Sequence, residues 1–149
     1  LFGKYGVLTE RELDSRYEVY AEQYIHAVNV ESNLVVEMAR TMVLPAAVRY
    51  QGELASSLAN LKAIGIELDH ATILQVTDLI GSLQDSVAEL VALKANENDA
   101  ADVAAHCHFV KDLILPKMLE VRKIVDALED IVADDLWPLP TYQEMLFIR

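Results

Sequence analysis

The residues that could carry chemistry are few, and the most suggestive group is the run His106–Cys107–His108. Imidazole and thiolate groups are common ligands of zinc and other transition metals. The run lies in a segment with helical periodicity, however, and residues two apart on an α-helix point about 200° apart. The two imidazoles therefore cannot share one ion. We interpret Cys107 as a buried thiol with one inner and one exposed histidine beside it.

A second possible metal site is Glu67–Leu68–Asp69–His70, which has the Glu-x-x-His spacing of di-iron helical bundles. Such a site needs that pair twice, together with two further inward glutamates, and the second pair is missing. Glu22 and His26, four residues apart, are more typical of a surface hydrogen bond. The sequence also contains no Gly-rich phosphate loop, no Gly-x-Ser-x-Gly elbow and no Cys-x-x-Cys pair. We therefore predict no catalytic residue, no cofactor-binding residue and no metal ligand in this chain.

The elements that would position any site are helices, and the first is predicted from Thr9 onward. Thr9 and Glu12 have the spacing of a capping box, and Leu8 is placed to act as a hydrophobic staple. Helical periodicity continues to Pro45, whose ring removes a backbone donor and crowds the preceding turn. It then resumes up to Gly65, a residue type that commonly ends helices. Residues 10–64 are thus predicted to form either one kinked helix or two.

An apolar stripe with spacings near three and four marks the face that this first segment should bury. We expect its aromatic and sulfur-containing side chains to pack in the core instead of forming a cofactor pocket. Its members are Leu13, Tyr17, Tyr20, Tyr24, Val28, Val35, Met38 and Met42.

Two further helices are predicted downstream. Apolar residues repeat at three and four over roughly residues 70–95, and residues 96–99 form the next turn, with Asn98 or Asp99 as the helix cap. Asp102 should then lie in the first turn, where a negative charge suits the helix dipole. A third helical stripe runs from Val103 to Val132, with Pro116 as a predicted kink. The alternation of period two that strands need is absent from the sequence.

The lengths of these helices constrain how they pack. At 1.5 Å per residue, residues 10–64 would span about 80 Å if straight, against about 40 Å for the second helix. Either Pro45 folds the first segment back, or the overhanging half packs on something else; we favour the former. The predicted fold is all-α: an antiparallel up-down bundle of four helices over residues 1–133, the first long segment kinked or broken near Pro45, followed by an extended tail over residues 134–149.

The tail combines the only tryptophan with two prolines and many large apolar groups. Thr141 and Glu144 have capping-box spacing, so we predict a last short helical turn there. If these apolar groups were exposed, they would form a sticky patch. We therefore expect the tail to dock on a surface. The candidate docking or interface residues are Trp137, Leu139, Tyr142, Leu146 and Phe147.

Charge narrows the range of partners. The net charge of −12 repels phosphate backbones and anionic lipids, so we expect neither a nucleic-acid nor a membrane partner, and no apolar run is long enough to span a bilayer. A single cysteine agrees with the cytoplasm, where disulfides are rare. The chain begins with Leu1 and shows no signal-peptide pattern, so we expect an upstream part.

An acidic cluster lies near the end of the third helix, where the helix dipole is already negative. A solvated face would explain it, but basic groups from another domain or subunit, or from the first segment of this chain, would also relieve the repulsion. The cluster comprises Asp126, Glu129, Asp130, Asp134 and Asp135, and the possible partners within the chain are Arg11, Arg16 and Arg40.

Three stretches carry a resemblance to a known family. The closing run Asp134–Phe147 (DDLWPLPTYQEMLF) resembles the C-terminal end of type III glutamine synthetases. Similar matches are Lys4–Leu13 (KYGVLTEREL) with Ser15–Glu18 (SRYE), and Pro45–Ala47 with Tyr50–Gln51. Together they bracket the whole chain, and the long closing run is the most specific, whereas residues 55–130 are generic helix.

The resemblance implies a parent enzyme that joins ammonia to glutamate at the expense of ATP, with Mg or Mn, in a homo-oligomer of stacked rings. It places the catalytic core upstream of this chain. For the chain itself it implies a non-catalytic helical domain that packs on its own catalytic core or on neighbouring subunits. The alternative of another class is an independent helical bundle that binds a metal ion or a small ligand.

Overall fold

The computed structural model describes residues 3–67, 69–96, 102–140 and 142–146. The described part contains helices and no strand, which confirms the predicted all-helical bundle. A long rod comprises α1 (Glu10–Met38), a π-helical turn (Ala39–Val43) and α2 (Leu44–Ala63). The second rod is α3 (Ala71–Ala95). The third comprises α4 (Val103–Phe109), another π-helical turn (Val110–Ile114) and α5 (Leu115–Glu129), and a short α6 (Tyr142–Leu146) lies in the tail.

The long rod begins at the predicted capping box. The Thr9 hydroxyl accepts a hydrogen bond from the Glu12 backbone N–H at 3.3 Å, while the Glu12 carboxylate accepts one from the Thr9 N–H at 2.8 Å. This backbone hydrogen bond favours the ionised carboxylate and lowers the pKa of Glu12. The rod ends before Gly65, whose φ of 84° allows the Ile66 N–H to reach the Leu61 carbonyl at 3.0 Å. Both ends of the first segment therefore confirm the sequence prediction.

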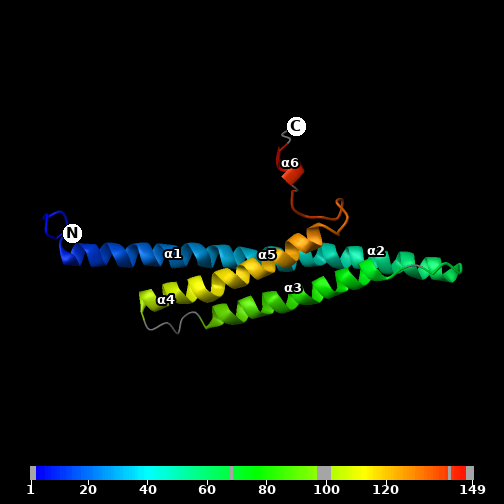
Figure 1. The fold of residues 1–149 in the computed structure, drawn as a ribbon, viewed down its shortest axis with the longest axis horizontal. Coiled ribbons are helices and arrows are strands. Elements are labelled where there is room, and N and C mark those ends of the chain that lie inside the picture. Colours follow the sequence, from blue (N-terminus) through cyan, green and yellow to red (C-terminus); the bar gives the residue numbers. More distant parts are fainter. Residues whose placement is uncertain (1–2, 68, 97–101, 141, 147–149) are drawn as a thin grey trace.

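Pro45 is accommodated by the π-helical turn that precedes it. Proline lacks a backbone N–H and crowds the carbonyl four residues earlier, and a π-helical turn is one way to relieve that conflict. The backbone nevertheless stays helical, with φ and ψ of −59° and −43° at Ala39 and −58° and −46° at Leu44. In Figure 1, α1 and α2 accordingly lie end to end. Pro45 therefore does not fold the first segment back on itself, contrary to the arrangement that we favoured from the helix lengths.

A π-helical turn also accommodates Pro116 in the third rod. This turn, Val110–Ile114, comes just before the proline. At the start of this rod Asp102 is the N-cap itself, and its carboxylate accepts a hydrogen bond from the Ala105 N–H at 2.7 Å. It thus lies one position outside the helix, not in its first turn as predicted. The other predicted caps, Asn98 and Asp99, lie outside the described residues.

The three rods share one core. Helix α3 packs against α2 and α5, while α4 packs against α1 (Figure 1). Small residues such as Ala39 and Ala47 are buried in this core. The most deeply buried apolar side chains come from all three rods: Val43, Val76, Leu83, Leu90, Val110, Ile114, Val121 and Leu128.

The first turns of α1 extend beyond the ends of α3 and α4 (Figure 1). Every residue from 9 to 20 is exposed, and Ala21 is the first buried residue of the helix. The expectation of core packing is therefore wrong for Tyr17, Tyr20 and Tyr24, whereas Val28 of the same predicted stripe is buried in the core. The exposed fractions are 57% for Tyr17, 67% for Tyr20 and 37% for Tyr24.

The cause is the choice of contact face. Helix α1 buries Ala21, Ile25 and Val28, with Ser32 following on the same face. At 100° per residue, the tyrosine stripe lies roughly 80° around the helix from that face. This face combines the small Ala21 and Ser32 with Ile25 and Val28, and the tyrosines are left beside the contact. The structure also holds, among the residues it describes, no helix with the length and hydropathy needed to cross a membrane.

Candidate docking site

The residues that suggested metal chemistry do not converge. The Cys107 thiol faces α1, where it donates a hydrogen bond to the Ala21 carbonyl at 3.8 Å. The exposed His108 lies 4.0 Å from Asp112, one turn further along, and His106 is half-buried. No three His, Cys, Asp or Glu side chains among residues 3–67, 69–96, 102–140 and 142–146 gather where they could hold a metal ion. The described residues therefore do not fit a divalent metal centre.

The Glu-x-x-His segment lies at the turn between α2 and α3. Glu67 and His70 are both exposed, and Asp69 accepts a hydrogen bond from the Ala71 N–H at 3.1 Å, which supports the start of α3. Leu68, between them, lies outside the described residues. The role visible at this segment is thus the capping of a helix.

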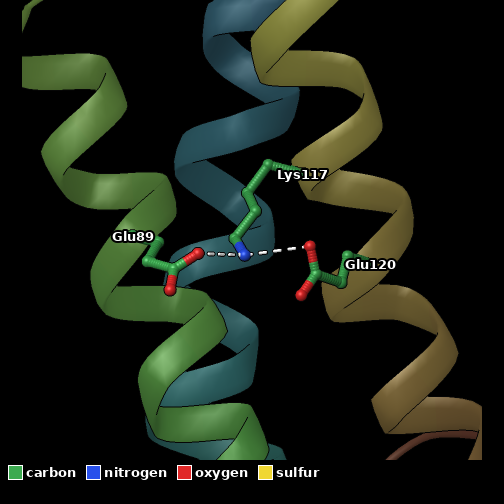
Figure 2. Close-up of polar contacts among 3 residues, drawn as sticks. All are labelled: Glu89, Lys117 and Glu120. Atoms are coloured by element: carbon green, nitrogen blue, oxygen red, sulfur yellow. Dashed lines mark hydrogen bonds and ion pairs between the residues drawn. The ribbon is translucent and has the colours of Figure 1, made fainter.

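A half-buried lysine links the second rod to the third (Figure 2). Lys117 of α5 lies between Glu89 of α3 and Glu120 of its own helix, and its side chain is only 10% exposed. The Lys117 Nζ is 2.9 Å from the Glu120 carboxylate and also donates a hydrogen bond to Glu89. Hydrogen bonding to Glu89 is the main reason why the pKa of Lys117 is raised above its usual value near 10.5. We call this ion-paired contact, which links α3 to α5, the lysine tie.

We predict that Lys117→Met lowers the free energy of unfolding by about 1 kcal/mol at neutral pH. The methionine keeps most of the apolar stem, and the two glutamates are more than half exposed, so they regain water. A raised lysine pKa stabilises the fold fully below pH 10.5, and this contribution is lost as the pH rises through the raised value. Urea unfolding from pH 7 to 11 should therefore show that the difference between the variant and the parent is constant up to about pH 10 and begins to narrow at the alkaline end.

Lys111→Met is the matched control, because Lys111 is 69% exposed and its nearest carboxylate, on Asp112, is 4.0 Å away. It should change the free energy of unfolding by no more than about 0.5 kcal/mol at any pH. Equal effects of the two substitutions would contradict the tie.

A second lysine joins α3 to the long rod. Lys94 donates hydrogen bonds to the Ser32 hydroxyl at 2.7 Å and to the Asn29 carbonyl at 3.4 Å, and it also contacts the Asn33 side-chain oxygen. Ser32 is fully buried and donates in turn to the Asn29 carbonyl at 3.0 Å. The buried hydroxyl is thereby satisfied, and α1 and α3 are held together near the C-terminal end of α3.

The acidic cluster is only partly neutralised within the chain. Arg122 lies 3.6 Å from Asp126. In the described part of the chain, the remaining members of the cluster form no ion pair: Glu129, Asp130, Asp134 and Asp135. The basic residues proposed as partners from the sequence do not reach them. Arg11 and Arg16 lie at the exposed start of α1, away from the end of α5 (Figure 1), and Arg40 borders a groove beside Gln84.

The tail residues proposed for docking have different environments. Trp137 is 8% exposed and belongs to the core cluster, and its indole N–H is buried without a hydrogen-bond partner among the described residues. Leu139 is half-buried and lines an apolar groove of about 330 Å³ with Val43 and Val121. Leu146 is 78% exposed. The side chain of Tyr142, Phe147 and the predicted cap Thr141 lie outside what the structure describes.

A second apolar surface, missed by the sequence prediction, lies at the start of the long rod. We call Leu13, Tyr17, Tyr20 and Tyr24 the overhang stripe; all four are exposed. The stripe borders an open hollow of about 390 Å³ between α1 and α4, whose α4 side includes Cys107 and His108. The spacing of four, three and four residues between these side chains was visible in the sequence. What could not be seen there is that all four side chains stay exposed although α4 lies across the hollow.

Comparisons with known proteins found one family and several relatives that are similar to this chain. Residues 1–62 match the family described as the glutamine synthetase C-terminal domain. The chain is 30% identical over 159 residues to the type-3 glutamine synthetase of Dictyostelium discoideum, covering 100% of this chain and 21% of that protein. It is 30% identical over 151 residues to a glutamine synthetase of Bacteroides fragilis (strain YCH46), covering 96% of this chain and 21% of the relative. A glutamine synthetase of Butyrivibrio fibrisolvens is 29% identical over 154 residues, and the match covers 99% of this chain and 22% of that relative. The chain therefore spans about a fifth of the length of these relatives.

Proposed function

We propose, on the premise that this chain matches the C-terminal part of type-3 glutamine synthetases, that the whole protein joins ammonia to glutamate at the expense of ATP. The observation that carries the proposal is the similarity along the whole chain, which agrees with the resemblance of its first and last segments. ATP and Mg or Mn belong to the parent enzyme. Its location is the cytoplasm, and its assembly is a homo-oligomer.

Within that enzyme, the role that we propose for this chain is structural. We place the binding of ATP and the metal in other parts of the protein, as the resemblance implies. The chain supplies a rigid set of three rods that packs on its own catalytic core and on neighbouring subunits. Its acidic cluster, with four carboxylates that lack ion pairs in the described part, suits contact with basic groups of such a partner.

The tail contributes to this role in two ways. Trp137 and Leu139 hold the tail on the bundle, because both pack against it. Leu146 is exposed beyond them and is available to contact the core or a neighbouring subunit. Tyr142 and Phe147 are proposed for the same contact from the sequence alone. This division follows from burial, since a side chain already in the core of its own chain has little surface left for a partner.

The test of the proposed function is an activity assay on the full-length protein. Purified enzyme with glutamate, ammonia, ATP and Mg or Mn should form glutamine and ADP. Residues 1–149 alone should form no glutamine and should show no heat of binding with ATP or with Mn²⁺ by calorimetry. A full-length protein that forms no glutamine would overturn the proposal. Stoichiometric binding of Mn²⁺ by residues 1–149, lost when Glu67 and His70 are replaced, would favour an independent metal-binding bundle.

A further inference from the structure

We propose that the overhang stripe is the surface on which the domain preceding this chain packs in the full-length protein. This inference rests on the proposed function, because it takes its partner from the longer protein. The occupant is an apolar groove of that preceding domain, bordered by lysine or arginine side chains.

The first argument is that the stripe is contiguous. Side chains three and four apart are neighbours on a helix surface, so Leu13, Tyr17, Tyr20 and Tyr24 form one continuous apolar band. Exposed apolar side chains are normal when scattered singly, but a continuous band of this size is typical of an interaction surface. Three of the four are tyrosines, which are enriched where one partner side chain must be both apolar and able to hydrogen-bond.

The second argument concerns the stability of the helix itself. Residues 10–20 are exposed on every side, yet they form regular helix. Helices gain most of their stability from packing an apolar face, and short unpacked helices are marginal in water. The capping box at Thr9 contributes, but it acts only on the first turn. A packing partner on the stripe supplies the missing contribution.

The third argument identifies the occupant by position. The relatives are about five times as long as this chain, and the chain matches their C-terminal part, so most of their length precedes residue 1. The overhang is the N-terminal end of the long rod (Figure 1), so it is the first helix that follows that preceding polypeptide in the chain. The match to the family covers residues 1–62, which contain the overhang and the rod that carries it.

Charge argues against a second copy of this chain as the occupant. Residues 10–24 contain five acidic and two basic side chains, so two such helices packed together would bring net negative charge against net negative charge. A groove with basic borders would instead match the flanks of the stripe. The hollow between α1 and α4 adds space in which an apolar side chain of the partner can insert.

The first experiment is photo-crosslinking in the full-length enzyme, with Tyr20 replaced by benzoylphenylalanine. The matched control carries the same replacement at Leu74, which is 61% exposed on α3. We expect Tyr20 to crosslink to peptides that precede residue 1, at a yield about tenfold or more above that of the Leu74 control. Crosslinks to residues 10–24 of a second copy, or a yield no higher than that of the control, would overturn the proposal.

The second experiment uses the double substitution Tyr17→Glu with Tyr20→Glu in the full-length enzyme. Both side chains are exposed, so the domain should keep its helical circular dichroism. We expect trypsin to cleave after Arg11, which lies away from both substitutions, about tenfold faster than in the parent, because undocking frees the first turns of α1. Leu74→Glu should leave the cleavage rate unchanged, and an unchanged rate in the double variant would refute the docking. An enzyme that forms glutamine but fails these tests refutes only this inference, whereas one that forms no glutamine refutes the proposed function.

Discussion

Leu90→Ala is expected to lower the free energy of unfolding of the chain by roughly 2–5 kcal/mol. Leu90 lies on α3, is fully buried and belongs to the cluster to which all three rods contribute. Truncation removes apolar burial and leaves a cavity that rods held by neighbouring contacts can close only in part. The measurement is urea unfolding of residues 1–149 followed by circular dichroism at 222 nm.

Leu74→Ala is the control for this prediction, because it makes the same chemical change on the same helix. Leu74 is 61% exposed, so the free energy of unfolding should change by no more than about 0.5 kcal/mol. A result in which both substitutions cost the same would mean that α3 does not present the face containing Leu90 to the other rods. A change in the slope of the unfolding curve would instead point to a loss of two-state behaviour.

The helices and their ends could be predicted from the sequence because the signals are local. Thr9 and Glu12 are three residues apart and satisfy each other's backbone donors, and Gly65 adopts the positive φ that few other residues tolerate. Each of these interactions is complete within one turn of the helix. Local signals therefore located the first and last turns of the long rod.

The face that a helix buries was harder to predict. Periodicity identified an apolar stripe through Tyr17, Tyr20 and Tyr24, but packing selected the neighbouring face with Ala21 and Ile25. Close approach of two helices favours small side chains at the contact, and periodicity weighs large and small apolar residues alike. The exposure of the tyrosines also depends on how far the other rods reach, which one helix does not encode.

The path of the chain at Pro45 could also be predicted only in part. The sequence indicated a disturbance there, and the structure has a π-helical turn just before it. Whether the chain then turns back is decided by packing, and Val43 and Ala47, on either side of Pro45, are both buried against the same core. A straight rod keeps both contacts.

The contact between Lys117 and Glu89 could not be predicted from the sequence either. The two residues are 28 positions apart in the chain, and only the packing of α3 against α5 brings them together.

Trp137→Ala is the second substitution with a large expected effect, roughly 3–5 kcal/mol in the free energy of unfolding. Trp137 is the largest side chain in the core cluster, and it joins the tail to the bundle. Its loss should both open a cavity and release the residues that follow. Urea unfolding measures the first effect, and amide hydrogen exchange of residues 142–146 measures the second. Leu146→Ala, at a site 78% exposed, is the control and should change neither.

Trp137→Phe separates the two contributions of the indole. Phenylalanine keeps much of the apolar area, and it removes an N–H that is buried without a partner among the described residues. An unsatisfied buried donor costs roughly 1–3 kcal/mol, which offsets part of the lost packing. Trp137→Phe should therefore cost much less than Trp137→Ala, by about 2 kcal/mol or more. If the two substitutions cost the same, the N–H is satisfied in solution, and the role of Trp137 includes a polar contact. In the full-length protein, a Trp137→Ala variant that keeps the oligomeric state and the rate of glutamine formation of the parent would count against the proposed role of the tail in docking.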